Sequence, residues 1–274
     1  MIKVEQLRKN FSGKQVLSDV SFSIEPKNVL ALVGPNGAGK TTTIKCLSGV
    51  IKPDGGTIVL FGEAFQYVSS VRAKQKIAVV PEERITFRNF TASDYVHLWS
   101  NFYPNWNDSI FSNFVARYGF DLSQKVESYS IGMKTLFLVG LCVCSQADLL
   151  ILDEPTQHLD PTVRLEVMSL LKEYAKNEKA VLVSSHEIFE LEEYATHIAI
   201  IKEGRIIYAN SIDGAKENHR LIEKGESIRS GEVIGLVGQS VLLKTDADVG
   251  RYPKLNEIVV AYLTGKTERR LTLN

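Results

Sequence analysis

Hydrophobic and polar residues alternate along the first part of the chain and then give way to a continuous apolar run. Within residues 1–24 the alternation is clearest at 20–24, which predicts short strands joined by a turn at residues 11–14. Residues 29–33 are apolar without interruption, as in a strand buried on both faces of a sheet. A helix is expected next, at residues 41–47. This part predicts an antiparallel β element followed by the first strand of a buried core sheet.

Residues 86–147 differ from their surroundings because they are rich in aromatic, Ser and Asn residues at helical spacing. We interpret them as a helical subdomain inserted between two parts of the sheet. Most of the aromatic side chains, such as Trp99 and Trp106, are expected to form the core of this subdomain. The alternative is that they contact a partner and transmit motion.

Strands and helices alternate after this insertion. Strands are expected at residues 149–152, 180–184 and 197–202, with one helix from Thr162 and another through Leu191. In the helix from Thr162, apolar residues recur at i, i+4, i+7, i+8 and i+11, the stripe of a helix packed on a sheet. The alternation predicts an α/β fold with a mostly parallel core sheet and crossover helices.

The pattern changes again beyond about residue 210. Short strands are expected at residues 220–222, 232–237 and 240–244, followed by a helix at residues 255–263. We interpret residues 211–274 as a small α+β C-terminal extension, an accessory element that follows a main domain of residues 1–210.

The charge balance and the cysteines indicate which partners and which redox environment are expected for this chain. Lys+Arg and Asp+Glu both number 32, so no global electrostatic field favours nucleic acid or anionic lipid. No segment approaches the roughly 18 uninterrupted apolar residues of a membrane span. The three cysteines, Cys46, Cys142 and Cys144, are odd in number and form no C-x-x-C pair, which fits a reduced protein. For Cys142 and Cys144, packing in a helix is favoured over metal binding.

Residues 34–41 read Gly-Pro-Asn-Gly-Ala-Gly-Lys-Thr and match the phosphate-binding pattern G-x-x-x-x-G-K-[ST]. The glycines let backbone N–H groups converge on phosphate oxygens, and the following helix directs the positive end of its dipole at them. Lys40 is expected to reach the β- and γ-phosphates and Thr41 to bind Mg²⁺. The expected nucleotide-binding residues here are Gly34, Pro35, Asn36, Gly37, Ala38, Gly39, Lys40, Thr41 and Thr42.

Asp153 and Glu154 end the apolar run at residues 149–152, which places two carboxylates at the carboxyl edge of the sheet. We expect Asp153 to hold the Mg²⁺ shell through water and Glu154 to polarise the attacking water. The predicted fold is therefore that of a P-loop NTPase, with ATP and Mg²⁺ as cofactors. An acidic pair that merely marks a helix entry is the alternative, and the phosphate-binding loop disfavours it.

On these motifs, residues 1 to about 205 resemble the ATP-binding subunit of an ABC transporter. The resemblance implies that Phe11 stacks on adenine, a contact that needs only the face of an aromatic ring. The alternative for Phe11 is a hydrophobic residue at a strand end.

Residues 129–133, Tyr-Ser-Ile-Gly-Met, resemble the family signature Leu-Ser-Gly-Gly-Gln and retain Ser130 and Gly132. In the family this segment contacts the γ-phosphate bound by the opposite subunit, so the resemblance implies a dimer that closes around two ATP molecules. Ile131 and Met133 depart from the signature, and an ordinary helix start capped by Ser130 is the alternative.

Two further residues match the family by position. His186 follows the expected strand at 180–184, as does the switch histidine that contacts the γ-phosphate and positions catalytic groups. The resemblance implies a catalytic role for His186 beside Glu154. Asp160 matches the loop that links the two sites across the dimer, whereas His158 is unusual in that loop.

Glu82 marks the clearest departure, because the family has Gln at this point after a strand. Its carboxylate could accept a hydrogen bond from water or bind Mg²⁺, but it adds negative charge near a triphosphate. Residues 81–84, Pro-Glu-Glu-Arg, and the Ser-x-Gly-Met-Lys form of the signature resemble the ATPases of exporters for drugs, peptides or lipids.

The resemblance implies a cytoplasmic ATPase, peripheral on the inner face of the cell membrane, that powers export through separate permease subunits. Its second ATPase subunit could be identical or different, and nucleic acid is not an expected partner. One alternative is a soluble ABC-type ATPase that acts on nucleic acid or ribosomes, which the zero net charge and single site set disfavour. Another is an immunity or regulatory subunit that hydrolyses ATP weakly.

Overall fold

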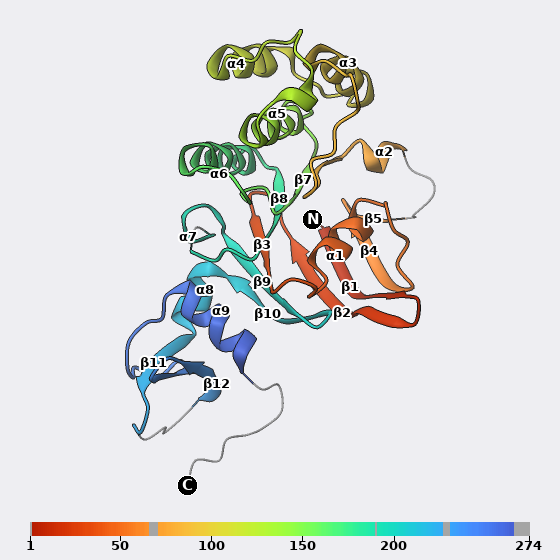
Figure 1. The fold of residues 1–274 in the computed structure, drawn as a ribbon. Helices are drawn as coiled ribbons and strands as arrows, with labels where there is room; N and C mark the ends of the chain where they lie inside the picture. Colours follow the sequence, from red (N-terminus) through yellow and green to blue (C-terminus); the bar gives the residue numbers. More distant parts are fainter. Residues whose placement is uncertain (1, 66–70, 190, 227–230, 266–274) are drawn as a thin grey trace.

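A ten-stranded sheet forms the centre of the computed structural model, which describes residues 2–65, 71–189, 191–226 and 231–265 (Figure 1). The strand order is β5-β4-β1-β2-β10-β9-β3-β8-β7-β6. In chain order the strands are β1 Ile2–Phe11, β2 Lys14–Ile24, β3 Val29–Val33, β4 Gly55–Leu60, β5 Glu63–Ala64, β6 Ile77–Val80, β7 Leu149–Asp153, β8 Ala180–Ser185, β9 His197–Lys202 and β10 Arg205–Ser211.

The core of the sheet is parallel, as predicted: β6, β7, β8, β3 and β9 pair side by side in one direction. All five residues of β3 are buried because helices cover both faces. Leu30 and Leu32 pack with residues of α1 (Lys40–Leu47), whereas Val29, Ala31 and Val33 belong to the core under α5 and α6. A strand covered on both sides cannot alternate apolar with polar residues, which explains its continuous apolar run.

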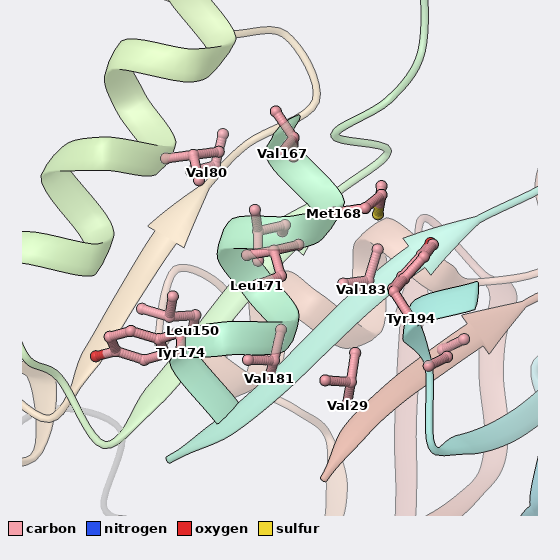
Figure 2. Close-up of a cluster of buried hydrophobic side chains, with 14 of the residues drawn as sticks. Val29, Val80, Leu150, Val167, Met168, Leu171, Tyr174, Val181, Val183 and Tyr194 are labelled. Carbon is pink, nitrogen blue, oxygen red and sulfur yellow. The ribbon is translucent and has the colours of Figure 1, made fainter. Parts of the chain in front are cut away.

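Helix α6 (Pro161–Lys176) packs on this sheet along the apolar stripe expected from its sequence. Figure 2 shows Val167 and Leu171 of α6 in one buried cluster with Val181 and Val183 of β8. Asp160 caps the helix and Pro161 occupies its first position, where the missing N–H costs nothing. The predicted helix from Thr162 is therefore confirmed, and it begins one residue earlier.

The predicted helical subdomain lies between β6 and β7. It contains α3 Ala92–Phe102, α4 Asp108–Tyr118, the 3₁₀ helix η1 Val126–Ser128 and α5 Ile131–Cys144. Its aromatic residues mainly form a core, because Phe114, Phe120 and Phe137 are buried with ring centroids about 5.5 Å apart. Cys142 and Cys144 are also buried, on α5. Figure 1 shows this subdomain at the top of the molecule, far from the C-terminal element.

The N-terminal antiparallel element is present, but its strands are long rather than short. β1 and β2 extend over 10 and 11 residues and meet at a tight turn, where Ser12 and Gly13 have φ of 47° and 82°. Irregularities in the register of β1 interrupt the alternation of apolar residues without ending the strand, so the sequence suggested shorter pieces. The short helix α2 (Val71–Lys74) precedes β6 and was not predicted.

The predicted helix through Leu191 is wrong in extent. Residues 187–189 are not helical, and α7 consists of Leu191–Tyr194 only. Ser185 explains the difference, since its Oγ accepts from Glu187 N and donates to Glu187 O, which holds the chain in a turn. The sequence reading also missed β10.

The C-terminal element contains the predicted strands and helix, which are β11 His219–Glu223, β12 Glu232–Val237, β13 Ser240–Lys244 and α9 Leu255–Thr264. They follow α8 (Ile212–Glu217), which was not predicted, and form a sheet of order β11-β13-β12. Residues 266–274 lie outside the described residues. Tyr208 of β10 stacks on Tyr262 of α9 at 4.6 Å between ring centroids, and Tyr262 hydrogen-bonds to buried His219. The element thus packs directly on the sheet.

Candidate nucleotide-binding site

The phosphate-binding loop lies at the carboxyl end of β3 and leads into α1, as its sequence predicts. Gly37 and Gly39 have φ of 78° and 111°, a conformation that side chains with a Cβ rarely adopt. Gly34 is required for a different reason, because a Cβ there would clash with the carbonyl oxygen of Ile201. The loop is further held where Gly204 N donates to Ala38 O at 3.0 Å. The glycines therefore allow both the shape of the loop and its close packing.

Lys40 directs its ammonium group into this loop. Its side chain is 6% exposed, and Nζ donates to Gly34 O at 2.7 Å. The same nitrogen lies 3.2 Å from Oε1 of Glu154. A buried ammonium group is stable only with such partners, so the loop and Glu154 together hold the charge of Lys40 at the end of the sheet.

Asp153 and Glu154 are both buried at the carboxyl end of β7, where Ser184 of the neighbouring β8 connects them. The hydroxyl group of Ser184 donates to Asp153 Oδ1 and accepts from Glu154 N at 2.9 Å. Ser184 was not among the predicted site residues, although it stands two residues before His186. Its position at the end of the predicted strand at residues 180–184 could have indicated that it lies near Asp153, which ends another strand of the sheet.

Glu154 has φ of 46°, an uncommon conformation for a residue other than glycine, and its carboxylate lies between two groups. Oε1 lies near Lys40, and Oε2 lies 2.8 Å from Nδ1 of His186. The His186 side chain is 34% exposed, so its ring borders solvent while Glu154 is enclosed. The structure therefore brings the two predicted catalytic residues into direct contact.

These residues border a cavity of about 280 Å³ at the carboxyl edge of the sheet. Nine predicted site residues line it: Asn36, Gly37, Gly39, Lys40, Thr41, Thr42, Glu82, Glu154 and His186. Val16 and Gln157 also line it and were not predicted. Gly34, Pro35, Ala38 and Asp153 are not among the lining residues, although they belong to the same loop and strand end.

Ser130, Gly132 and Asp160 lie together elsewhere, at the N-termini of α5 and α6, and do not line the cavity. Ser130 Oγ accepts from Met133 N at 3.2 Å, and Asp160 Oδ1 accepts from the N–H groups of the first turn of α6. A Cβ on Gly132 would lie 3.9 Å from Asp160 Oδ2. Ser130 thus caps its helix, the alternative raised from the sequence, and is also exposed and able to meet another molecule.

Phe11 lies at the end of β1 and is 42% exposed. Its ring centroid is 5.4 Å from the ammonium nitrogen of Lys9. Phe11 is not among the cavity-lining residues, whereas Val16 of the adjoining strand β2 is. Stacking of Phe11 on adenine stays a prediction.

Comparison with known protein families identifies the family of this chain. Residues 17–157 match the family described as "ABC transporter", which is just over half of the 274 residues. The chain therefore belongs to the ABC transporter family, and it is an ATP-binding ATPase subunit of the kind that couples ATP hydrolysis to transport.

Individual relatives agree with this membership. The chain is 31% identical over 223 residues to the lantibiotic transport ATP-binding protein SrtF of Streptococcus pyogenes, which covers 81% of this chain and 95% of the relative. It is 27% identical to the bacitracin transport ATP-binding protein BcrA of Bacillus licheniformis, with 95% of this chain and 89% of the relative covered. A solved structure described as the ATP binding subunit of an ABC transporter matches with a TM-score of 0.72 and 25% identity, over 79% of this chain and 92% of that one.

Proposed function

We propose that this chain binds and hydrolyses ATP at the cavity formed by the phosphate-binding loop, Glu82, Glu154 and His186, and thereby powers export. One observation carries the assignment of catalysis: the buried carboxylate of Glu154 contacts Lys40 on one side and His186 on the other. A carboxylate held at the edge of a phosphate site can accept a proton from the attacking water, and Lys40 can neutralise phosphate charge. His186 then orients Glu154 and reaches the γ-phosphate.

Mg²⁺ fits the donor set at this site. Thr41 supplies a hydroxyl group at the start of α1, and buried Asp153 supplies a carboxylate held by Ser184. Mg²⁺ in nucleotide sites commonly uses few protein ligands and completes its shell with water and phosphate oxygens. Thr41 would bind the ion directly and Asp153 through water. Bound there, the ion would neutralise charge on the β- and γ-phosphates.

The working unit that we propose is a dimer that closes around two ATP molecules. Ser130 and Asp160 are exposed and Gly132 is partly buried, and none of the three lines the cavity of its own chain. If this group meets the γ-phosphate of a second subunit, both the capped helix start at Ser130 and the small residue at Gly132 serve the contact. The second subunit is either an identical copy or a related chain.

We propose that the dimer works on the inner face of the cell membrane, bound to separate permease subunits. No helix among the described residues is long and apolar enough to cross a bilayer. Four large apolar side chains are exposed on the loop after β6 and on α3, namely Ile85, Phe87, Leu98 and Phe102. Such exposed apolar residues, close in sequence to Glu82, suit the contact through which a permease senses the nucleotide state.

The proposed cargo is a drug, peptide or lipid. Relatives are described as ATP-binding proteins for lantibiotic transport, bacitracin transport and linearmycin resistance. These names, together with residues 81–84, support export and disfavour action on nucleic acid or ribosomes. Identification of the membrane protein that co-purifies with this chain, followed by a transport assay in vesicles, tests direction and cargo.

We further propose that residues 211–274 form an accessory element on a catalytic domain of residues 1–210. The alignment to BcrA covers 95% of this chain and so extends into that element. The alignment to SrtF covers 81% of this chain yet 95% of the relative. That contrast is consistent with a part that varies among ATPases of similar function.

Glu154→Gln tests the proposed catalysis. The amide keeps the size of the side chain but cannot accept a proton, so kcat for phosphate release should fall by about 100-fold or more, the scale of a general base, while ATP still binds. Glu173→Gln, on the exposed side of α6, is the matched control and should hydrolyse ATP at the rate of the unmodified protein. Equal rates for Glu154→Gln and the control would favour the weakly hydrolysing regulatory subunit.

A further inference from the structure

Arg84 is a buried arginine next to the site whose role the family motifs do not define. It is 8% exposed, lies four residues after β6 and has φ of 46°. The backbone N–H of Arg84 donates to Pro81 O at 3.3 Å, and this bond closes a turn over residues 81–84. In the part of the chain that the structure describes, no carboxylate lies within ion-pair distance of its guanidinium group.

The guanidinium group instead donates to backbone carbonyls of the turn that follows β7. Nη2 donates to Glu154 O at 2.8 Å and to Pro155 O at 3.0 Å. Nη1 donates to Glu82 O at 3.3 Å. One planar group therefore connects the backbone of the loop that carries Glu82 to the backbone of the residue that carries the proposed catalytic carboxylate.

Burial of the Arg84 guanidinium group carries a desolvation cost. Taking an arginine out of water is unfavourable, and the Nε of Arg84 has no hydrogen-bond partner, although the nearby charge of Glu82 offsets part of this cost. Burial also lowers the pKa of Arg84 from its usual value, although arginine stays charged in proteins. The planar guanidinium group carries several N–H donors in a fixed fork, so one side chain can bond to carbonyl groups of two loops at once.

The bonds to the turn bear on the orientation of Glu154. Glu154 adopts a conformation that is uncommon outside glycine, which persists only where its surroundings hold it. Ser184 holds its N–H and Arg84 holds its carbonyl oxygen, so the peptide groups on both sides of the residue are fixed. The direction of the carboxylate toward Lys40 and His186 depends on these two anchors.

We infer that Arg84 is a positioning residue for ATP hydrolysis: it fixes the backbone of Glu154 and ties it to the loop that carries Glu82. This inference rests on the proposed catalytic role of Glu154. Arg84 does not line the nucleotide cavity, so it acts on the rate of hydrolysis and not on the binding of ATP.

Arg84→Ala tests this inference through a split between rate and affinity. We expect kcat to fall by about 10- to 100-fold, the effect of displacing a catalytic group by roughly 1 Å, while the Kd for ATP measured without turnover stays within about threefold. Addition of guanidinium chloride at a concentration too low to denature should restore part of kcat, whereas equal sodium chloride should not.

Arg220→Ala is the matched control. Arg220 is 7% exposed and also donates to backbone carbonyls, those of Glu217 and His219, but it lies in the C-terminal element. Its removal should lower the unfolding temperature and leave kcat unchanged. If Arg84→Ala does not fold, Arg84→Lys keeps the charge with a single nitrogen, which cannot reach both loops, and it should show the same split in a milder form.

The outcomes separate the two proposals. An unchanged kcat in Arg84→Ala or Arg84→Lys overturns the inference, and so does a fall in kcat accompanied by an equal loss of ATP affinity. Glu154→Gln, measured in parallel, tests the underlying assignment. If Glu154→Gln is inactive while the Arg84 variants are fully active, only the inference about Arg84 fails. If Glu154→Gln is active, the proposed function fails first.

Discussion

Glu82 and Glu154 place two carboxylates on one cavity whose expected ligand is itself negatively charged. Lys40 lies beside Glu154, and the backbone N–H groups of the phosphate-binding loop also favour anions. The Glu82 carboxylate makes no ion pair with Arg84, which contacts the Glu82 backbone carbonyl, and its charge acts on the Arg84 guanidinium group only at longer range. Its charge therefore opposes the binding of triphosphate more than it serves the site.

Glu82→Gln is accordingly expected to preserve ATPase activity. The amide keeps the shape and an acceptor oxygen while removing the repulsive charge, so kcat should stay within about threefold, less than 1 kcal/mol in barrier height. Phosphate release at saturating ATP measures the effect, with Glu83→Gln on the exposed neighbour as control. Near-total loss of activity would instead show that the Glu82 carboxylate has a specific catalytic role.

Helix α5 connects the helical subdomain to the core sheet, because it packs against α4 on one side and against α6 and β6 on the other. The helix consists mainly of apolar residues, and most of those from Thr135 to Cys144 are buried. Gly140 leaves room for a side chain of α4, since a Cβ there would overlap the ring of buried Phe114. The packing of α4 against α5 therefore requires a glycine at position 140.

Gly140→Ala should destabilise the fold by about 1–3 kcal/mol, the usual cost of overpacking a core, despite the better helix propensity of alanine. Urea unfolding followed by circular dichroism measures the change. The same substitution in a Phe114→Leu background should cost less, because the smaller side chain vacates the space. Additive effects of the two substitutions would contradict the clash as the cause.

Prediction of the elements succeeded where the signal was local. The apolar stripe of α6 and the continuous apolar run of β3 each lie within one element, and the aromatic residues at 86–147 recur at helical spacing within the successive helices of the subdomain. Prediction failed around α7, where a serine side chain holds a turn, and at β10 and α8, whose short sequences carry little periodicity. Strand ends set by pairing, as in β1, cannot be read from one strand alone.

At the scale of the whole molecule, the two parts of the proposed site lie apart. The cavity uses the ends of β3, β6, β7 and β8, whereas Ser130 and Gly132 begin a helix of the inserted subdomain. In the dimer that we propose, the helix start of a second subunit covers the nucleotide and completes the site. Binding of ATP should therefore be a property of one chain, and hydrolysis a property of two.

Gly132→Asp should separate these two properties. A Cβ at this position meets no atom closer than 3.5 Å, so a side chain fits there. Because Asp160 Oδ2 lies 3.9 Å from the Cβ, the circular dichroism spectrum and ATP affinity of the single chain are measured first to show that the variant folds. The added carboxylate would face phosphate in the dimer, and hydrolysis should fall by about tenfold or more through like-charge repulsion while the single chain still binds ATP.

Light scattering with ATP, in a Glu154→Gln background that prevents turnover, measures dimer formation directly. The same charge added on the outer face of α4, Ser112→Asp, is the control and should leave both dimer and activity intact. Full hydrolysis by Gly132→Asp would contradict the role of this segment in a dimer.

The sequence by itself determined the phosphate-binding loop, the acidic strand end and the α/β alternation, because glycine positions and apolar periodicity act within a few residues. The tertiary structure decided which side chains meet. Glu154 reaches His186, Ser184 and Arg84, which lie 32, 30 and 70 residues away in sequence. These contacts follow from β7 lying between β6 and β8, and strand order is a property of the whole packed sheet. Ser130, Gly132 and Asp160 lie outside the cavity because they begin α5 and α6, whose positions are also set by packing on the sheet. The sequence shows these residues and the phosphate-binding loop as motifs, but it does not show that they are separate in one chain.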